Sequence, residues 1–116
     1  MMMLMGKVKN EREQDKIIEE YLKMHPYVSR ERGKNPTKEQ MIAICIEELL
    51  HKMPKKEAMF VKYRYFKCWS VLKIAHEMCY SQQMVYVIRK RALKIIYHGI
   101  SHLLEELEDR FVTHIC

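Results

Sequence analysis

Helix breakers are almost absent from this chain, and their absence limits its fold more than any other feature. Only three Gly and three Pro occur among the 116 residues, of which 48% are hydrophobic. The rest is rich in Lys, Glu, Leu and Met, which favour helices. Apolar residues recur at helical spacing, and no segment is a clear candidate for a strand. We therefore predict an all-α fold, a small domain of five to six helices.

The length allows one hydrophobic core but not two cores that pack independently. Within residues 1–36 we expect an amphipathic helix from Asn10 to Met24 and then a polar, Gly-containing loop from Tyr27 to Pro36. Residues 37–116 should form the main helical domain. The pattern leaves open whether the first helix docks on that domain or binds a partner.

Capping signals and breakers divide residues 37–116 into helices. Thr37 and Gln40 form a capping-box pattern before a helix that ends near Pro54. A second helix should run from Lys55 to Phe66. Their expected core residues are Met41, Ile42, Cys45, Ile46 and Leu49 in the first helix, and Met59, Tyr63 and Phe66 in the second.

Ser70 and Ser81 are candidate N-caps of two further helices, separated by a short turn. Gly99 suggests a break before an acidic C-terminal helix over Ser101 to Val112. The expected buried residues are Val71, Ile74, Ala75 and Met78, then Val85, Ile88, Ala92 and Ile95 or Ile96, and finally the stripe Leu103, Leu104, Leu107 and Phe111. This last stripe could equally close the core or form the seam of a homodimer.

The positive charge of the chain is confined to its middle. Residues 51–100 carry eleven basic and two acidic residues, a net charge of +9. Residues 1–50 carry nine of each sign, and residues 101–116 have a net charge of −3. A basic segment of this density is typical of a surface that binds the phosphates of a nucleic acid.

Two short helices joined by a tight turn, with amides and cations on the second, are typical of a helix-turn-helix that reads the major groove of double-stranded DNA. Gln can pair with adenine edges and Arg with guanine edges, whereas Lys and hydroxyl groups more often meet phosphates. The candidate DNA-binding residues are Ser81, Gln82, Gln83, Tyr86, Arg89, Lys90 and Lys94, with Lys73 and Arg64 from the preceding helices. Lys55, Lys56 and Lys62 are candidates for phosphate contact only.

Several of these residues resemble region 4 of the sigma-70 family. They are Arg64-Tyr65-Phe66, Trp69-Ser70, Ile74-Ala75, Ser81, Val85 and Arg91-Ala92-Leu93, and the resemblance extends from about Met59 to Ile96. It places a helix-turn-helix unit at about residues 59–98. The stretch from Ser81 to Leu93 is also similar to sigma-like late-gene transcriptional regulators of phages.

The resemblance implies a free-standing module that binds promoter DNA, acts with RNA polymerase and so activates or redirects transcription. The chain departs from the family pattern in its two turns, where Cys68 and Cys79 replace the usual glycines. A residue other than Gly is uncommon at positive φ. We therefore expect either a different backbone in these turns or modest strain.

The DNA-binding hypothesis predicts that Arg89→Ala or Gln83→Ala relaxes sequence preference, whereas Lys94→Ala weakens all DNA binding about equally. The substituted turns and the acidic tail favour a second hypothesis. In it, the chain binds RNA polymerase or a sigma factor and redirects it without reading bases. RNA binding ranks last, because no sheet of stacking aromatic residues is expected.

Other functions have little support in the sequence. There is no phosphate loop and no nucleophile motif, so we expect no enzyme and no cofactor. His76 with Cys79, His98 with His102, and His114 with Cys116 lack the paired spacing of a zinc site, so we expect no metal.

The sequence also bears on the location of the protein. Met1 to Met5 is too short for a signal peptide, and no later run approaches the roughly 20 apolar residues of a membrane-spanning helix. Cys45, Cys68, Cys79 and Cys116 match no secreted disulfide scaffold. We expect a cytoplasmic protein with reduced thiols and no membrane contact.

Overall fold

The computed structural model describes residues 10–28 and 35–115, with the side chains of the last helix described as far as Leu104, apart from His102. The predicted starting segment Met1 to Met5, most of the predicted loop and Cys116 lie outside the described residues. Within them the chain is all-α and contains no strand, as predicted. The five α-helices, the 3-10 helix η1 and the π-helix η2 are α2 (Glu11–Met24), η1 (His25–Tyr27), α3 (Lys38–Lys52), α4 (Lys55–Val61), η2 (Lys62–Phe66), α5 (Val71–Met78) and α6 (Gln82–Ile115).

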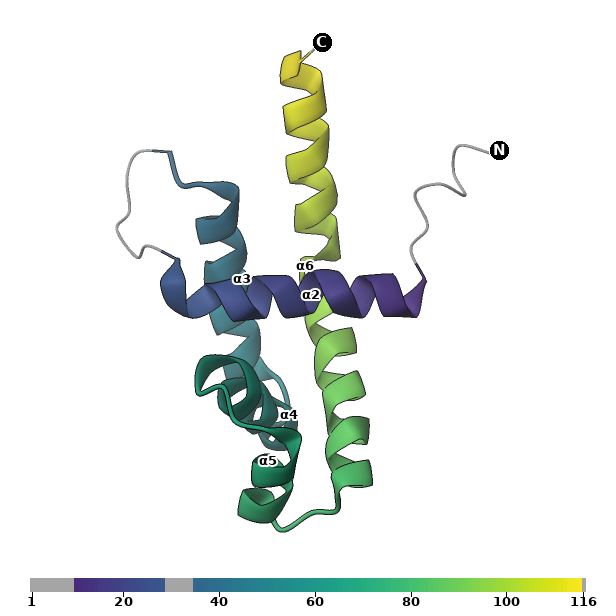
Figure 1. Ribbon diagram of the computed structural model, residues 1–116. Coiled ribbons are helices and arrows are strands. Elements are labelled where there is room, and N and C mark those ends of the chain that lie inside the picture. Colours follow the sequence, from purple (N-terminus) through teal and green to yellow (C-terminus); the bar gives the residue numbers. More distant parts are fainter. Residues whose placement is uncertain (1–9, 29–34, 116) are drawn as a thin grey trace.

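The long helix α6 organises the fold (Figure 1). It contacts α2, α3, α4 and α5, and α2 crosses it near its middle. The short helices α4 and α5 lie at one end, where a tight turn leads from α5 into α6. The last turns of α6 extend past α2, away from the other helices.

Local side-chain caps start the helices where the sequence predicts. Thr37 and Gln40 form the reciprocal capping box of α3, with distances of 2.9 and 3.1 Å. At α2, the Glu13 N–H donates to Asn10 Oδ1 at 2.8 Å. Each cap satisfies an N–H group that has no partner inside its helix. The first residues of these helices therefore follow from interactions within three residues of the cap.

Helix α2 belongs to the same core as the rest of the chain. Ile18 and Leu22 are 0% exposed and belong to the same buried cluster as Ile42, Ile46 and the buried residues of α6. At the end of α2 the His25 ring is buried and stacks on Phe66, with 4.6 Å between the ring centroids. Of the two alternatives left open by the sequence, the structure shows docking.

The predicted single helix over Lys55 to Phe66 is wrong in its second half, because the backbone widens into the π-helix η2. A π-turn contains more residues than an α-turn, so the residues after Val61 are rotated relative to α-helical spacing. The predicted face of Met59, Tyr63 and Phe66 is only half-buried. The fully buried face instead holds Phe60, Val61 and Tyr65.

The predicted break at Gly99 is also wrong, since α6 continues through this residue. Gly99 instead leaves room for a side chain of α3, because a Cβ atom there would lie 2.6 Å from Leu49 Cδ1. Beyond it, Leu103 and Leu104 are partly buried against the core. The side chains of Leu107 and Phe111 lie outside the described residues, so core closure and a dimer seam both remain predictions.

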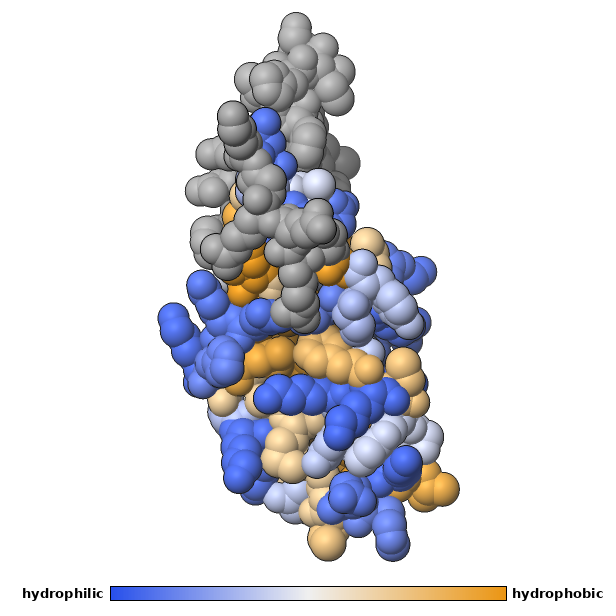
Figure 2. Space-filling view, turned by 90° about the vertical axis from the view of Figure 1, so that its left-hand side faces the viewer, coloured by the Kyte–Doolittle hydropathy of each residue, from blue (hydrophilic) through white to orange (hydrophobic). Residues whose placement is uncertain are grey.

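The surface of the described residues mixes hydrophilic and apolar side chains. Figure 2 shows hydrophilic side chains over most of one face, with apolar side chains in a band across its middle. The large apolar side chains that remain exposed in the described residues are Met24, Tyr27, Ile44, Leu72, Tyr86 and Val87. Three of these, Leu72, Tyr86 and Val87, lie on α5 and the start of α6.

The turns at Cys68 and Cys79 both adopt a left-handed backbone, which glycine adopts more readily than other residues. Cys68 has a φ of 59° and Cys79 a φ of 60°. Among the described residues, these two are the non-glycine residues with a positive φ. Cys79 ends α5 in this conformation, with its N–H donating to the last turn of the helix. The second sequence alternative is therefore the correct one. Both turns hold a non-glycine residue at positive φ, and they carry strain.

Replacing Cys79 with glycine should raise the free energy of unfolding by about 1 kcal/mol. A left-handed non-glycine residue costs about 1–2 kcal/mol, and the extra freedom of glycine in the unfolded chain cancels part of the gain. Urea unfolding of Cys79→Gly and Cys68→Gly measures the effect. Cys79→Ala and Cys68→Ala are the matched controls, because they remove the thiol and keep the strain. Equal stability of the glycine and alanine variants would contradict the strain.

Candidate nucleic-acid interface

Helices α5 and α6 are joined by three residues, and both begin at a serine cap. Ser70 Oγ accepts from the Lys73 N–H and Ser81 Oγ accepts from the Met84 N–H, each at 3.1 Å. Ile74 and Ala75 of α5 are buried with Val85 of α6, which holds the two helices on one core. The opposite faces of both helices lie at the surface. Because its hydroxyl accepts the Met84 N–H, Ser81 acts as the N-cap of α6.

The first turns of α6 divide into an inner and an outer face, as predicted. Val85, Ile88, Ala92 and Ile96 are buried, each at most 1% exposed. Gln82, Gln83 and Lys90 are exposed, as is Lys94 one turn further on, and Tyr86 is 51% exposed. Val87, which was not among the predicted DNA-binding residues, is 42% exposed on the same turns of the helix. The outer face thus combines two amides, a phenol and two cations.

Arg89 does not lie on the outer face, and this part of the prediction is corrected. Its side chain is only 26% exposed, and Nη2 lies 3.0 Å from Oε1 of Glu19 on α2. The other Glu19 oxygen accepts a hydrogen bond of 2.6 Å from the Tyr65 hydroxyl. One carboxylate therefore joins α2, η2 and α6. The sequence pattern could not show this, because Glu19 and Arg89 are far apart along the chain.

Burial and the Glu19 carboxylate together shift the pKa values of Tyr65 and Arg89. Burial, followed by the hydrogen bond from the hydroxyl to Glu19, raises the pKa of Tyr65 well above its ordinary value. For Arg89, burial lowers the pKa, but the hydrogen bond and charge of Glu19 outweigh it and raise the pKa overall. Both partners of Glu19 therefore keep their protons across the physiological pH range.

Arg64 of η2 and Lys73 of α5 both contact Trp69, which lies in the turn between these two helices. Arg64 Nη1 donates to the Trp69 carbonyl at 3.0 Å, so it stabilises the turn and is half-buried. Lys73 Nζ lies 4.3 Å from the centroid of the Trp69 ring. Lys67 Nζ lies 5.2 Å from the same ring, which stacks on Tyr63 at 4.4 Å. We name Tyr63, Lys67, Trp69 and Lys73 the lysine-aromatic cluster.

Lys67 is the residue in this cluster that the sequence analysis missed. Its proximity to Trp69 in the sequence is the signal that could have found it, because cations often lie over an indole ring. Both lysines are exposed and keep their charge at the surface. Lys67 and Lys73 therefore place two cations beside Trp69, just before and within the first turn of α5, in addition to the cations on the outer face of α6.

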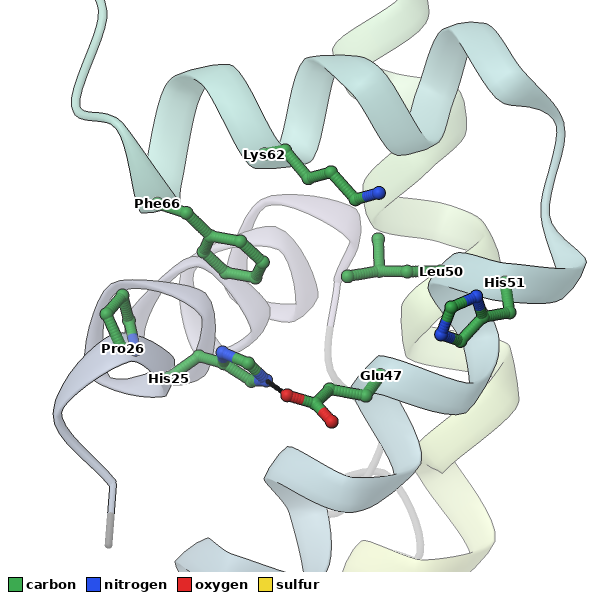
Figure 3. A pocket seen from close by; sticks show the side chains of 7 residues that line it. All are labelled: His25, Pro26, Glu47, Leu50, His51, Lys62 and Phe66. Atoms are coloured by element: carbon green, nitrogen blue, oxygen red, sulfur yellow. Dashed lines mark ion pairs between the residues drawn. The ribbon is translucent and has the colours of Figure 1, made fainter. Parts of the chain in front are cut away.

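A separate pocket of about 440 Å³ lies between η1, α3 and η2 (Figure 3). His25 and Glu47 face each other across it, with His25 Nε2 at 3.5 Å from Glu47 Oε1. The other lining residues are Pro26, Leu50, His51, Lys62 and Phe66. None of them belongs to α5 or α6, so the pocket is distinct from the outer face described above.

The described residues hold no group of three His, Cys, Asp or Glu side chains placed to bind a metal ion. Cys45, Cys68 and Cys79 are free thiols. Burial, and then the charge of Glu48, raises the pKa of the Cys45 thiol. His102, His114 and Cys116, named above as candidate ligands, lie outside the described side chains.

Along residues 10–28 and 35–115, no helix is both long enough and apolar enough to cross a membrane. Comparisons of the chain with family models, with curated proteins and with solved structures find no match. The resemblance to region 4 of the sigma-70 family therefore rests only on residues of the sequence between about Met59 and Ile96.

Proposed function

We propose that this protein is a cytoplasmic DNA-binding transcriptional regulator that reads promoter DNA with α5 and α6, acting together with RNA polymerase. The observation that carries the proposal is the outer face of α6. Its first turns present Gln82, Gln83 and Tyr86 directly after a tight turn from a bracing helix. Residues at the N-terminal end of a recognition helix are those that reach base edges in the major groove.

The cations around this face support the same proposal. Lys90 and Lys94 continue the outer face along α6, while Lys67 and Lys73 stand at the start of α5. Phosphate contacts from such cations give DNA binding its affinity, whereas contacts to base edges give it sequence specificity. In our proposal Gln82, Gln83 and Tyr86 meet the bases, and the four lysines meet the phosphates.

The proposal is tested with a random-sequence library of duplex DNA at two salt concentrations, from which the bound fraction is sequenced. We expect enrichment of one sequence motif, and an affinity that falls steeply as salt rises. Salt-sensitive binding without enrichment would contradict base reading. Absence of any binding would overturn the proposal as a whole.

Gln83→Ala should weaken discrimination between the preferred site and other sequences by about 1–3 kcal/mol, because a bidentate amide contact to adenine is lost. Lys94→Ala is the matched control on the same helix. It should weaken binding to every sequence about equally and reduce the salt slope by about 1. Titration of each variant with the enriched duplex and with a scrambled duplex measures both quantities. An unchanged preference in Gln83→Ala would show that the proposed reading face is wrong.

A second candidate function is a module that binds RNA polymerase or a sigma factor without reading bases. The exposed apolar side chains of Leu72 and Val87 favour it, at 64% and 42% exposed, because they lie on the same two helices as the cations. Co-purification with polymerase, together with no DNA shift at low salt, would support this function. Tight DNA binding by the isolated protein would argue against it.

A further inference from the structure

Arg89 lies at the edge of the proposed DNA-reading face. It follows Tyr86 by three residues and precedes Lys90, so a helix places it beside the exposed side of Tyr86. Its guanidinium can bind a phosphate with two parallel hydrogen bonds, which the ammonium group of a lysine cannot do. Yet its side chain is 26% exposed and directed to α2, at 3.0 Å from Glu19.

One side of α2 is acidic, next to the apolar residues Ile18 and Leu22 that α2 contributes to the core. Glu11, Asp15 and Glu19 are spaced four residues apart, so they share one side of the helix. Asp15 interacts electrostatically with both Arg89 and Lys90. Burial raises the pKa of Asp15, and the charges of these two cations act in the opposite direction. Glu19 and Asp15 thus place two carboxylates near two cations of α6, where they compete with any phosphate for these cations.

We propose that α2 masks Arg89 from DNA, because the Glu19 carboxylate occupies the guanidinium that would otherwise bind a phosphate. This inference rests on the proposed function. The affinity for DNA is then set by a competition between one internal carboxylate and the phosphates. Only the Arg89 side chain needs to change partner, since α2 itself stays packed through Ile18 and Leu22, both 0% exposed.

Glu19→Gln tests this competition. The amide keeps an acceptor for the Tyr65 hydroxyl but has no charge to hold Arg89, which becomes available to DNA. One added phosphate contact steepens the slope of log affinity against log salt by about 0.9. Lowering the salt fourfold, from about 200 to about 50 mM, therefore raises the affinity ratio of variant to wild type by about 3.5-fold. Fluorescence anisotropy of the full chain with a labelled random duplex measures the slope.

Glu20→Gln is the matched control, because it removes one negative charge from an exposed neighbour on the same helix. It changes the net charge as Glu19→Gln does but leaves the Arg89 contact intact. The double variant Glu19→Gln/Arg89→Gln should lose the added slope. A purely structural role of Glu19 would change the melting temperature in circular dichroism and leave the slope as it was.

Two results would overturn the inference while leaving the proposed function in place. In the first, wild type binds DNA and the slopes of Glu19→Gln and Glu20→Gln are equal. In the second, Arg89→Gln alone loses about 0.9 of the slope, which would mean that Arg89 already contacts a phosphate. This single variant keeps the inference testable if Glu19→Gln fails to fold. Absence of DNA binding by wild type and by every variant would overturn both the inference and the proposed function.

Discussion

Replacing Ile18 with alanine should lower the free energy of unfolding by about 2–5 kcal/mol, which is the usual cost of removing a fully buried Ile side chain. Ile18 is 0% exposed and lies in the main core cluster together with Leu22. The loss follows from transfer of the missing methyl groups and from the cavity that remains. Urea unfolding followed by circular dichroism measures it.

Ile17→Ala is the control for this experiment, because it makes the same chemical change one residue earlier. Ile17 is only half-buried, so less apolar surface is lost and the effect should be clearly smaller. Equal and small losses in the two variants would mean that α2 contributes little to the core. The helix would then be a loosely docked arm, and its masking of Arg89 would lose its structural support.

Phe60→Ala should cost about 3–5 kcal/mol, the largest loss expected from any single substitution discussed for this protein. The Phe60 side chain is 0% exposed, and its ring meets the Tyr65 ring edge to face with centroids 6.0 Å apart. Removing it leaves a cavity where α4 continues into the π-helix. Because Tyr65 also holds Glu19, the variant should loosen the contact between α2 and η2.

Met59→Ala is the matched control, since Met59 precedes Phe60 on α4 and is half-buried. The predictions from the sequence and from the structure differ here. Helical spacing placed Met59 in the core, whereas the structure places Phe60 there, so the order of the two losses decides between them. A larger loss in Met59→Ala, measured by urea unfolding, would contradict the described packing of α4.

The helix starts were predictable because caps act over a few residues. Thr37, Ser70 and Ser81 each bind an N–H group three residues later, so the signal and its partner lie in one short stretch. The positive φ values of Cys68 and Cys79 were similarly within reach, as one of two alternatives. They depend on the backbone path of two short turns, each next to a serine cap in the sequence.

Features that depend on distant partners were not predictable. Gly99 signalled a break in the sequence, but its small size accommodates Leu49 of α3 inside a continuous helix. Arg89 looked like an outer-face residue by spacing alone, but Glu19 of α2 draws it to the flank of α6. In both cases the deciding atom belongs to another helix, and helical periodicity carries no information about it.

The sequence by itself determined the all-α class, the starts of the capped helices and the division of α6 into a buried and an exposed face. These properties arise from periodicity and from short-range hydrogen bonds, which are encoded locally. Only the tertiary structure decided that α2 belongs to the core, that α4 widens into a π-helix, and that Glu19 rather than solvent faces Arg89. Those outcomes depend on how side chains from separate helices fill one shared interior, where packing density outweighs local preference.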